Sequence, residues 1–170
     1  RGVTAAELAA LDLPGRARAA RNAYVATLSE LVRHESPSLA VDACNALVDH
    51  LEARLAADGW SVTREARDGA GDVVTARLEG TSPATPGTPH GTLLLAHYDT
   101  VWPLGTLETM PVRVEGDVLA GPGAYDMKAG IATALHATAI AREAGGPSEP
   151  VTLLVTSDEE VGSGRSREVI

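Results

Sequence analysis

The chain has 170 residues, enough for one domain with a hydrophobic core, and 44% of them are hydrophobic, which excludes a disordered tail. Its 14 basic and 23 acidic residues give a net charge of -9, which argues against a nucleic-acid partner and against an anionic membrane surface. No apolar run approaches the roughly 18 residues of a membrane span. The single cysteine, Cys44, excludes an internal disulfide. We expect a cytoplasmic protein, although the chain begins with Arg1, and a removed leader would make it secreted or periplasmic.

Two amphipathic helices are predicted near the start of the chain. Residues 16–35 carry apolar side chains at helical spacing, and Ser36-Pro37 ends this helix because a residue before proline avoids the helical conformation. Residues 38–58 carry a second apolar stripe, which includes Cys44 and stops at Gly59. This position predicts that Cys44 is a small core residue.

Strands and helices then alternate. The period of two predicts strands at 60–66, 72–79 and 112–115, and the proline-containing segment 80–91 is typical of a surface loop. The wholly apolar run 92–96 predicts a strand covered on both faces. The remaining predicted elements are a helix at 126–144, a strand at 151–156 and a helix that begins at Arg165. This order predicts an α/β domain with a mostly parallel central sheet flanked by helices.

The first of three chemically distinctive clusters, His97-Tyr98-Asp99-Thr100, directly follows a predicted strand. Residues two apart in an extended chain point to the same side, so His97 and Asp99 can share one pocket. A histidine that binds a metal usually has its other ring nitrogen fixed by a nearby carboxylate, which is a suitable role for Asp99. Considered alone, the pair is better explained as a hydrogen bond that caps a strand.

The second cluster, residues 121–126, is a glycine-rich turn that ends in Asp126 at the start of a helix. A dinucleotide-binding turn is a poor alternative, since the third glycine is missing and Asp126 would place negative charge where a pyrophosphate binds. An N-cap role for Asp126, worth about 1 kcal/mol, stays open and is compatible with metal binding through its second oxygen.

The third cluster, Ser157-Asp158-Glu159-Glu160, follows the strand predicted at 151–156. Adjacent carboxylates at a buried strand end repel one another, and a cation would remove that repulsion. An exposed acidic turn is an equally good explanation of this cluster alone. Because ligands of open α/β sheets collect at the carboxyl ends of strands, the three clusters together predict an oxygen-rich metal site.

Three segments in register, His97-Tyr98-Asp99-Thr100-Val101, residues 121–128 and Asp158-Glu159-Glu160 followed by Gly162-Ser163, resemble one family. It comprises the di-zinc metallohydrolases, among them glutamate carboxypeptidases, aminoacylases, acetylornithine deacetylase and succinyl-diaminopimelate desuccinylase. The resemblance extends from about residue 35 to residue 170, and segments 101–106, 114–117 and 164–167 are most similar to the glutamate carboxypeptidase branch.

The resemblance implies a three-layer catalytic domain and assigns roles to five residues. His97 would bind one Zn²⁺, Glu160 the other, and Asp126 both, with Co²⁺ or Mn²⁺ as alternative metals. Asp99 would support His97, and Glu159 would be the general base that activates water between the metals. The implied activity is cleavage of an amide bond in a small peptide or N-acyl amino acid, with release of a C-terminal amino acid such as glutamate. A non-catalytic metal-binding or interaction module is the alternative.

The resemblance also implies parts that residues 1–170 do not contain. Relatives have a further acidic ligand, a late histidine ligand and a small lid domain that commonly dimerises. We therefore expect residues 1–170 to be the N-terminal part of the catalytic domain, incomplete at its C-terminus and inactive alone, and the full-length protein to be a homodimer. The peptide bond after Asp126 is expected to be cis, as it is in relatives.

Overall fold

The computed structural model describes residues 4–82 and 91–170. The helices are α1 (Ala5–Ala10), α2 (Leu13–Ala19), α3 (Arg21–Arg33), α4 (Val41–Ala57), α5 (Thr106–Thr109) and α6 (Ala129–Glu143). The strands are β1 (Ser61–Glu65), β2 (Val73–Leu78), β3 (Thr92–His97), β4 (Arg113–Glu115), β5 (Val118–Ala120) and β6 (Val151–Thr156). None of the described helices is long and apolar enough to cross a membrane.

The central sheet has four strands in the order β1-β2-β6-β3, and β4 and β5 form a separate two-stranded ribbon. β3 runs parallel to β6, whereas β1 is antiparallel to β2 and β2 is antiparallel to β6. The predicted α/β class is confirmed, but the sheet is mixed rather than mostly parallel. The period of two identifies a strand without giving its direction, and the short connection between β1 and β2 makes these two strands a hairpin.

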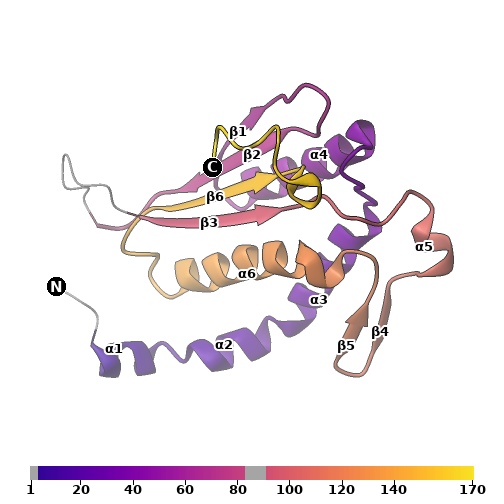
Figure 1. The fold of residues 1–170 in the computed structure, drawn as a ribbon. Coiled ribbons are helices and arrows are strands. Elements are labelled where there is room, and N and C mark those ends of the chain that lie inside the picture. The colour runs from indigo at the N-terminus through magenta and orange to yellow at the C-terminus, as the bar shows by residue number, and fades with distance from the viewer. Residues whose placement is uncertain (1–3, 83–90) are drawn as a thin grey trace.

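The hydrophobic core lies between one face of the sheet and the long helices. Side chains that alternate along the strands, among them Val74, Ala76, Leu153 and Val155, are buried in one cluster with the apolar residues of α3, α4 and α6. Figure 1 shows α6 and α3 below the sheet, while the C-terminal segment runs over its upper side. In the described part of the chain the helices thus cover one face of the sheet, and a third layer of helices is not seen there.

The opposite face explains one difference from the sequence prediction. Leu93 and Leu95 of β3 are 58% and 48% exposed, although the run 92–96 predicted a strand covered on both faces. β3 is the last strand in the order of the sheet, and its outer face receives no helix among the described residues. The apolar run of β3 therefore predicts the burial of its core side correctly, but it does not predict the exposure of its outer face.

Smaller differences occur in irregular regions. The predicted helix from Arg165 is wrong, because residues 164–169 form turns after a short helical turn at Glu159–Val161. α5 and β5 were not predicted, since each is only a few residues long. The predicted loop 80–91 lies mostly outside the described residues.

Cys44 is expected to resist alkylation in the native protein. Its side chain is fully buried in the core, its thiol donates to the carbonyl of Pro37, and burial raises its pKa to about 12. Because the thiolate is the reactive species, iodoacetamide at pH 8 should label the folded protein far more slowly than the guanidinium-unfolded protein, as measured by mass spectrometry. Equal labelling rates would contradict the burial of Cys44.

Candidate metal centre

All three acidic or histidine clusters lie at one edge of the central sheet. β3 and β6 are parallel neighbours with His97 opposite Thr156, so the chain leaves both strands at the same end. His97 is the last residue of β3, and Glu159 and Glu160 lie in the helical turn that follows β6. Asp126 lies in the irregular turn Ala124–Lys128 that leads into α6, and the peptide bond after it is cis, as the resemblance predicted.

The imidazole of His97 is buried and held by two aspartates. Its Nδ1 lies 3.1 Å from the carbonyl oxygen of Asp99, and its Nε2 lies 3.1 Å from Oδ1 of Asp126. Burial by itself lowers the pKa of His97, but the hydrogen bonds and charge of Asp99 and the hydrogen bond of Asp126 raise it to about 9. With Nδ1 donating to the Asp99 carbonyl, a neutral imidazole would present the lone pair of Nε2 to the opening of the site.

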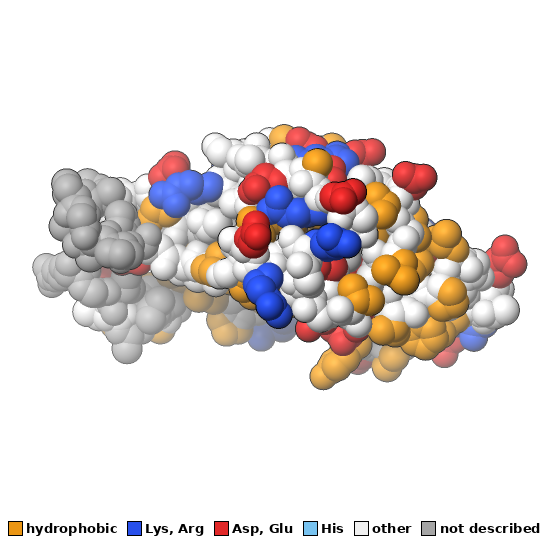
Figure 2. All heavy atoms as spheres, turned by 45° about the horizontal axis from the view of Figure 1, so that its top comes forward, with side chains coloured by type: hydrophobic (Ala, Val, Ile, Leu, Met, Phe, Trp, Pro, Cys, Tyr) orange, Lys and Arg blue, Asp and Glu red, His pale blue; other side chains and the backbone are white. Residues whose placement is uncertain are grey.

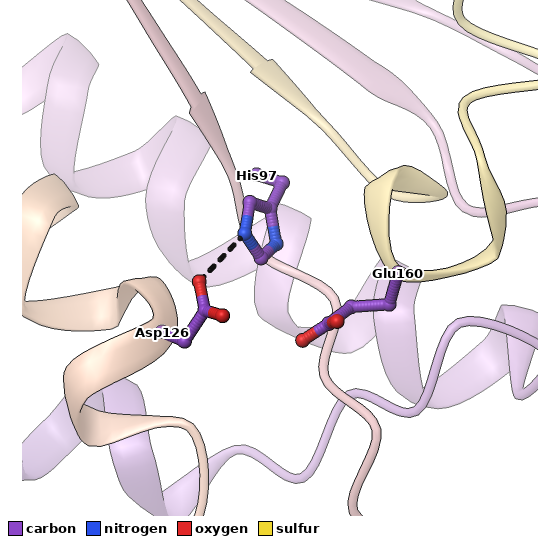
Figure 3. A group of neighbouring side chains, drawn as sticks. All are labelled: His97, Asp126 and Glu160. Atoms are coloured by element: carbon purple, nitrogen blue, oxygen red, sulfur yellow. Dashed lines mark hydrogen bonds and ion pairs between the residues drawn. The ribbon is translucent and has the colours of Figure 1, made fainter.

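Two further carboxylates face His97 from the turn after β6. Potential ligand atoms of His97, Asp126 and Glu160 all lie within 4.8 Å of one another. Figure 3 shows the three side chains, which come from separate segments, pointing toward a common centre. Oε2 of Glu159 lies 3.8 Å from Nε2 of His97. The sequence-predicted ligands are therefore brought together, with Glu159 beside them, and their roles as ligands stay predictions.

Asp99 connects the end of β3 with the turn that carries Glu159 and Glu160. Its carboxylate is fully buried, and it accepts hydrogen bonds from the amides of Glu159 and Glu160 at 3.3 and 3.2 Å. Oγ of Ser38 donates to the same carboxylate at 2.6 Å. Burial tends to raise the pKa of Asp99, but the hydrogen bonds from His97, Ser38 and the Glu160 amide lower it overall. Asp99 thus remains charged and fixes both the imidazole and the turn that carries the two glutamates.

The donor set fits a divalent cation. The site combines an imidazole nitrogen with carboxylate oxygens, which are the protein ligands of zinc, cobalt and manganese. The pKa of Glu160 is raised, first by burial and then by the negative charge of Asp126. A cation between these carboxylates would replace their repulsion with attraction, so the electrostatics as well as the geometry are suited to metal binding.

Sequence reasoning did not find two residues that support this site. Ser38 lies about 60 positions before its partner Asp99, and such a long-range contact leaves no local pattern. Lys128 is buried, and its Nζ donates to the carbonyl of His34 at 2.5 Å, which ties the turn of Asp126 to the end of α3. Burial lowers the pKa of Lys128 to about 8. The presence of Lys128 two residues after Asp126 was the only available signal.

Apolar side chains adjoin the site residues in sequence. Four exposed apolar side chains lie next to or near site residues in the sequence: Leu39, Val101, Tyr125 and Val161. Tyr125 is the most exposed of them, at 97%. Figure 2 shows hydrophobic side chains gathered on one side of the molecule, away from the mixed charges at the centre of that view. A cavity of about 330 Å³ lies at the same sheet edge, lined in part by His97, Met127, Glu159 and Ser163. The site is therefore open to solvent and has apolar neighbours.

Sequence comparison identifies relatives of this chain. Residues 93–170 match the family described as peptidase family M20/M25/M40. The chain is 36% identical over 151 residues to carboxypeptidase G2 from Pseudomonas sp. (strain RS-16). This alignment covers 87% of the chain and 35% of the relative, so the chain spans about a third of the length of carboxypeptidase G2.

Solved structures show the same fold. Human carnosine dipeptidase 1 matches with a TM-score of 0.73 and 18% identity, over 89% of this chain and 35% of that protein. An M20 family metallo-carboxypeptidase from Sulfolobus solfataricus matches with a TM-score of 0.72 and 22% identity, over 86% of this chain and 33% of that protein. The segment that matches peptidase family M20/M25/M40, residues 93–170, contains all five residues that the sequence analysis assigned to the site, namely His97, Asp99, Asp126, Glu159 and Glu160.

Proposed function

We propose that the full-length protein is a metal-dependent hydrolase that cleaves an amide bond in a small peptide or N-acyl amino acid. The convergence of His97, Asp126 and Glu160, with Glu159 beside them, is the observation that carries this proposal. The similarity to carboxypeptidase G2 supports a substrate from which a C-terminal amino acid such as glutamate is released.

We propose that His97 and Asp126 hold one Zn²⁺ and that Glu160 and Asp126 hold a second one. Bound metal ions would lower the pKa of a water molecule and polarise the scissile carbonyl. Co²⁺ and Mn²⁺ are alternatives, because the same nitrogen and oxygen ligands bind them. Asp99 would keep the imidazole of His97 oriented through its Nδ1, as carboxylates and carbonyls do for other metal-binding histidines.

Glu159 would act as the general base. It would accept a proton from the attacking water as the water oxygen bonds to the carbonyl carbon. It would then return that proton to the nitrogen as the carbon–nitrogen bond breaks, so that the products are a carboxylic acid and a free amine. The side chain of Glu159 is half exposed and close to the ring of His97, a position from which it can reach a water at the opening. A non-catalytic module would have no need of this carboxylate beside the ligands.

The proposed function is tested with the full-length protein. Metal analysis should find two ions per chain after equilibration with zinc. A screen of N-acyl amino acids and dipeptides with C-terminal glutamate should then show release of a free amine, detected with an amine-reactive dye. Removal of the metal by a chelator should abolish hydrolysis, and returning zinc should restore it. A protein that binds no metal, or binds two ions without hydrolysing any compound in the screen, would contradict the proposal.

A further inference from the structure

Asp158 is the first of three consecutive carboxylates, and its environment differs from that of the other two. Whereas Glu159 and Glu160 face the opening of the site, Asp158 is only 2% exposed. Its Oδ2 accepts from the amides of Arg165 and Ser166 at 2.6 and 3.2 Å, and its Oδ1 accepts a short hydrogen bond from Oγ of Ser166. Three donors, none of them a residue of the candidate metal centre, therefore converge on one buried carboxylate.

The backbone of Asp158 holds the same segment from its other side. The carbonyl oxygen of Asp158 accepts from the amide of Ser163 at 2.7 Å and from that of Val161 at 3.4 Å. Gly162 and Ser163 both have positive φ angles, 91° and 55°, so the chain reverses sharply here. Ser163 is a non-glycine residue in this region, where the backbone is strained unless surrounding contacts hold it. Asp158 thus closes residues 158–166 into a compact loop.

This loop carries the two glutamates of the site. The amides of Glu159 and Glu160 donate to the buried carboxylate of Asp99, while the far end of the loop is bound to Asp158. The loop is therefore held by two buried aspartates, Asp99 and Asp158, of which Asp99 also contacts the imidazole of His97. Ser163, in the middle of the loop, lines the cavity that also contains His97 and Glu159.

We propose that Asp158, together with Ser166, is a positioning residue that holds Glu159 and Glu160 in register with His97 and Asp126. This inference rests on the proposed function. An asparagine cannot replace Asp158, because its side chain offers one acceptor oxygen and its amide group would face donors. Loss of the carboxylate frees the loop, and the two glutamates then have to be ordered at the moment when metal and substrate bind.

The test compares four variants of the full-length protein. Asp158→Asn and Ser166→Ala remove hydrogen bonds that hold the loop of residues 158–166. Two matched controls change a carboxylate and a serine hydroxyl outside this loop. Asp72→Asn alters a largely buried aspartate that pairs with Arg64, and Ser29→Ala alters a buried serine of α3. Zinc affinity is measured by competition with a chromophoric chelator, hydrogen exchange by mass spectrometry on the metal-free protein, and kcat and KM on the substrate found in the screen.

Asp158→Asn is expected to weaken zinc affinity by about 10- to 100-fold, the usual effect of removing a group that orients a ligand. Its kcat should fall while KM changes little, and exchange should rise over residues 159–166 without rising in β3 or α6. Ser166→Ala, which removes one hydrogen bond, should change each quantity in the same direction by less. Both controls should keep the wild-type zinc affinity and the wild-type exchange of this loop.

Faster exchange of the loop with unchanged zinc affinity and unchanged kcat would overturn the proposal, because Asp158 would then stabilise the loop alone. If Asp158→Asn does not fold, the zinc affinity, kcat and loop exchange of Ser166→Ala are compared with those of Ser29→Ala, and the same outcomes support or overturn the proposal. A wild-type protein that binds no zinc would instead contradict the proposed function. The two failures are distinguishable, since hydrogen exchange is measured without metal.

Discussion

Glu159→Gln in the full-length protein is expected to lower kcat at least about 100-fold, the lower end of the contribution of a general acid–base group. Glutamine has nearly the same shape but cannot take a proton from water. The metal content should stay the same, because Glu159 is not a proposed ligand. Turnover of the substrate found in the screen and metal content by mass spectrometry provide the two measurements.

The neighbouring substitution Glu160→Gln is the matched control for this result. The two glutamates are adjacent, and the backbone amides of both donate hydrogen bonds to the carboxylate of Asp99. Either substitution should therefore disturb the loop to a similar extent. Glu160→Gln should lower the metal content, whereas Glu159→Gln should not. The opposite outcome, with metal lost from Glu159→Gln and retained by Glu160→Gln, would mean that the roles of the two residues are exchanged.

Asp126→Asn should weaken binding of both metal ions. A carboxylate that bridges two cations contributes to each of them, and an asparagine amide offers one neutral oxygen in its place. Even residues that only orient a ligand contribute about 10- to 100-fold in affinity, so loss of the bridging group should cost at least about 100-fold. Chelator competition gives the affinity, and the stoichiometry follows from metal analysis after dialysis.

The design of this experiment separates ligand loss from unfolding. Asp126 is largely exposed, and its neutralisation weakens the contact with His97 but also removes the repulsion of Glu160, so the metal-free protein should stay folded, as judged by circular dichroism and thermal unfolding. Asp117→Asn provides a control, since Asp117 is an exposed aspartate of the β4–β5 turn that pairs with Arg21. If Asp126→Asn retains both ions with the affinity of the Asp117→Asn control, Asp126 does not bridge them.

The sequence predicted the long elements of the fold well because their patterns are strong. The apolar stripe of α4 and the apolar run of β6 each identify an element whose core-facing side chains are buried as expected, and the run of β3 identifies the strand but not the exposure of its outer face. Strand direction was not predictable in the same way, since a period of two identifies a strand without giving its partner or its direction, and the antiparallel pairing of β2 with β6 leaves no local signal. Short elements such as α5 and β5 contain too few residues for any period to be detected.

The candidate site shows where local patterns stop being informative. His97, Asp126 and Glu160 were recognisable because each lies at a strand end or helix start within a short motif. Ser38 was not, because its contact with Asp99 depends on how α4 packs beside the end of β3. Turns take the place of the helix expected from Arg165, and the amides of Arg165 and Ser166 donate there to Asp158, seven residues earlier, a contact that leaves no local pattern.

Anomalous diffraction at the zinc absorption edge, from crystals of the full-length protein grown with zinc, tests the two-metal centre most directly. Two peaks that share Asp126 are expected. One should lie about 2 Å from Nε2 of His97, and the other about 2 Å from a carboxylate oxygen of Glu160. A single peak, or two peaks of which either lacks Asp126 as a ligand, would contradict the bridging role of Asp126 and with it the proposed two-metal centre.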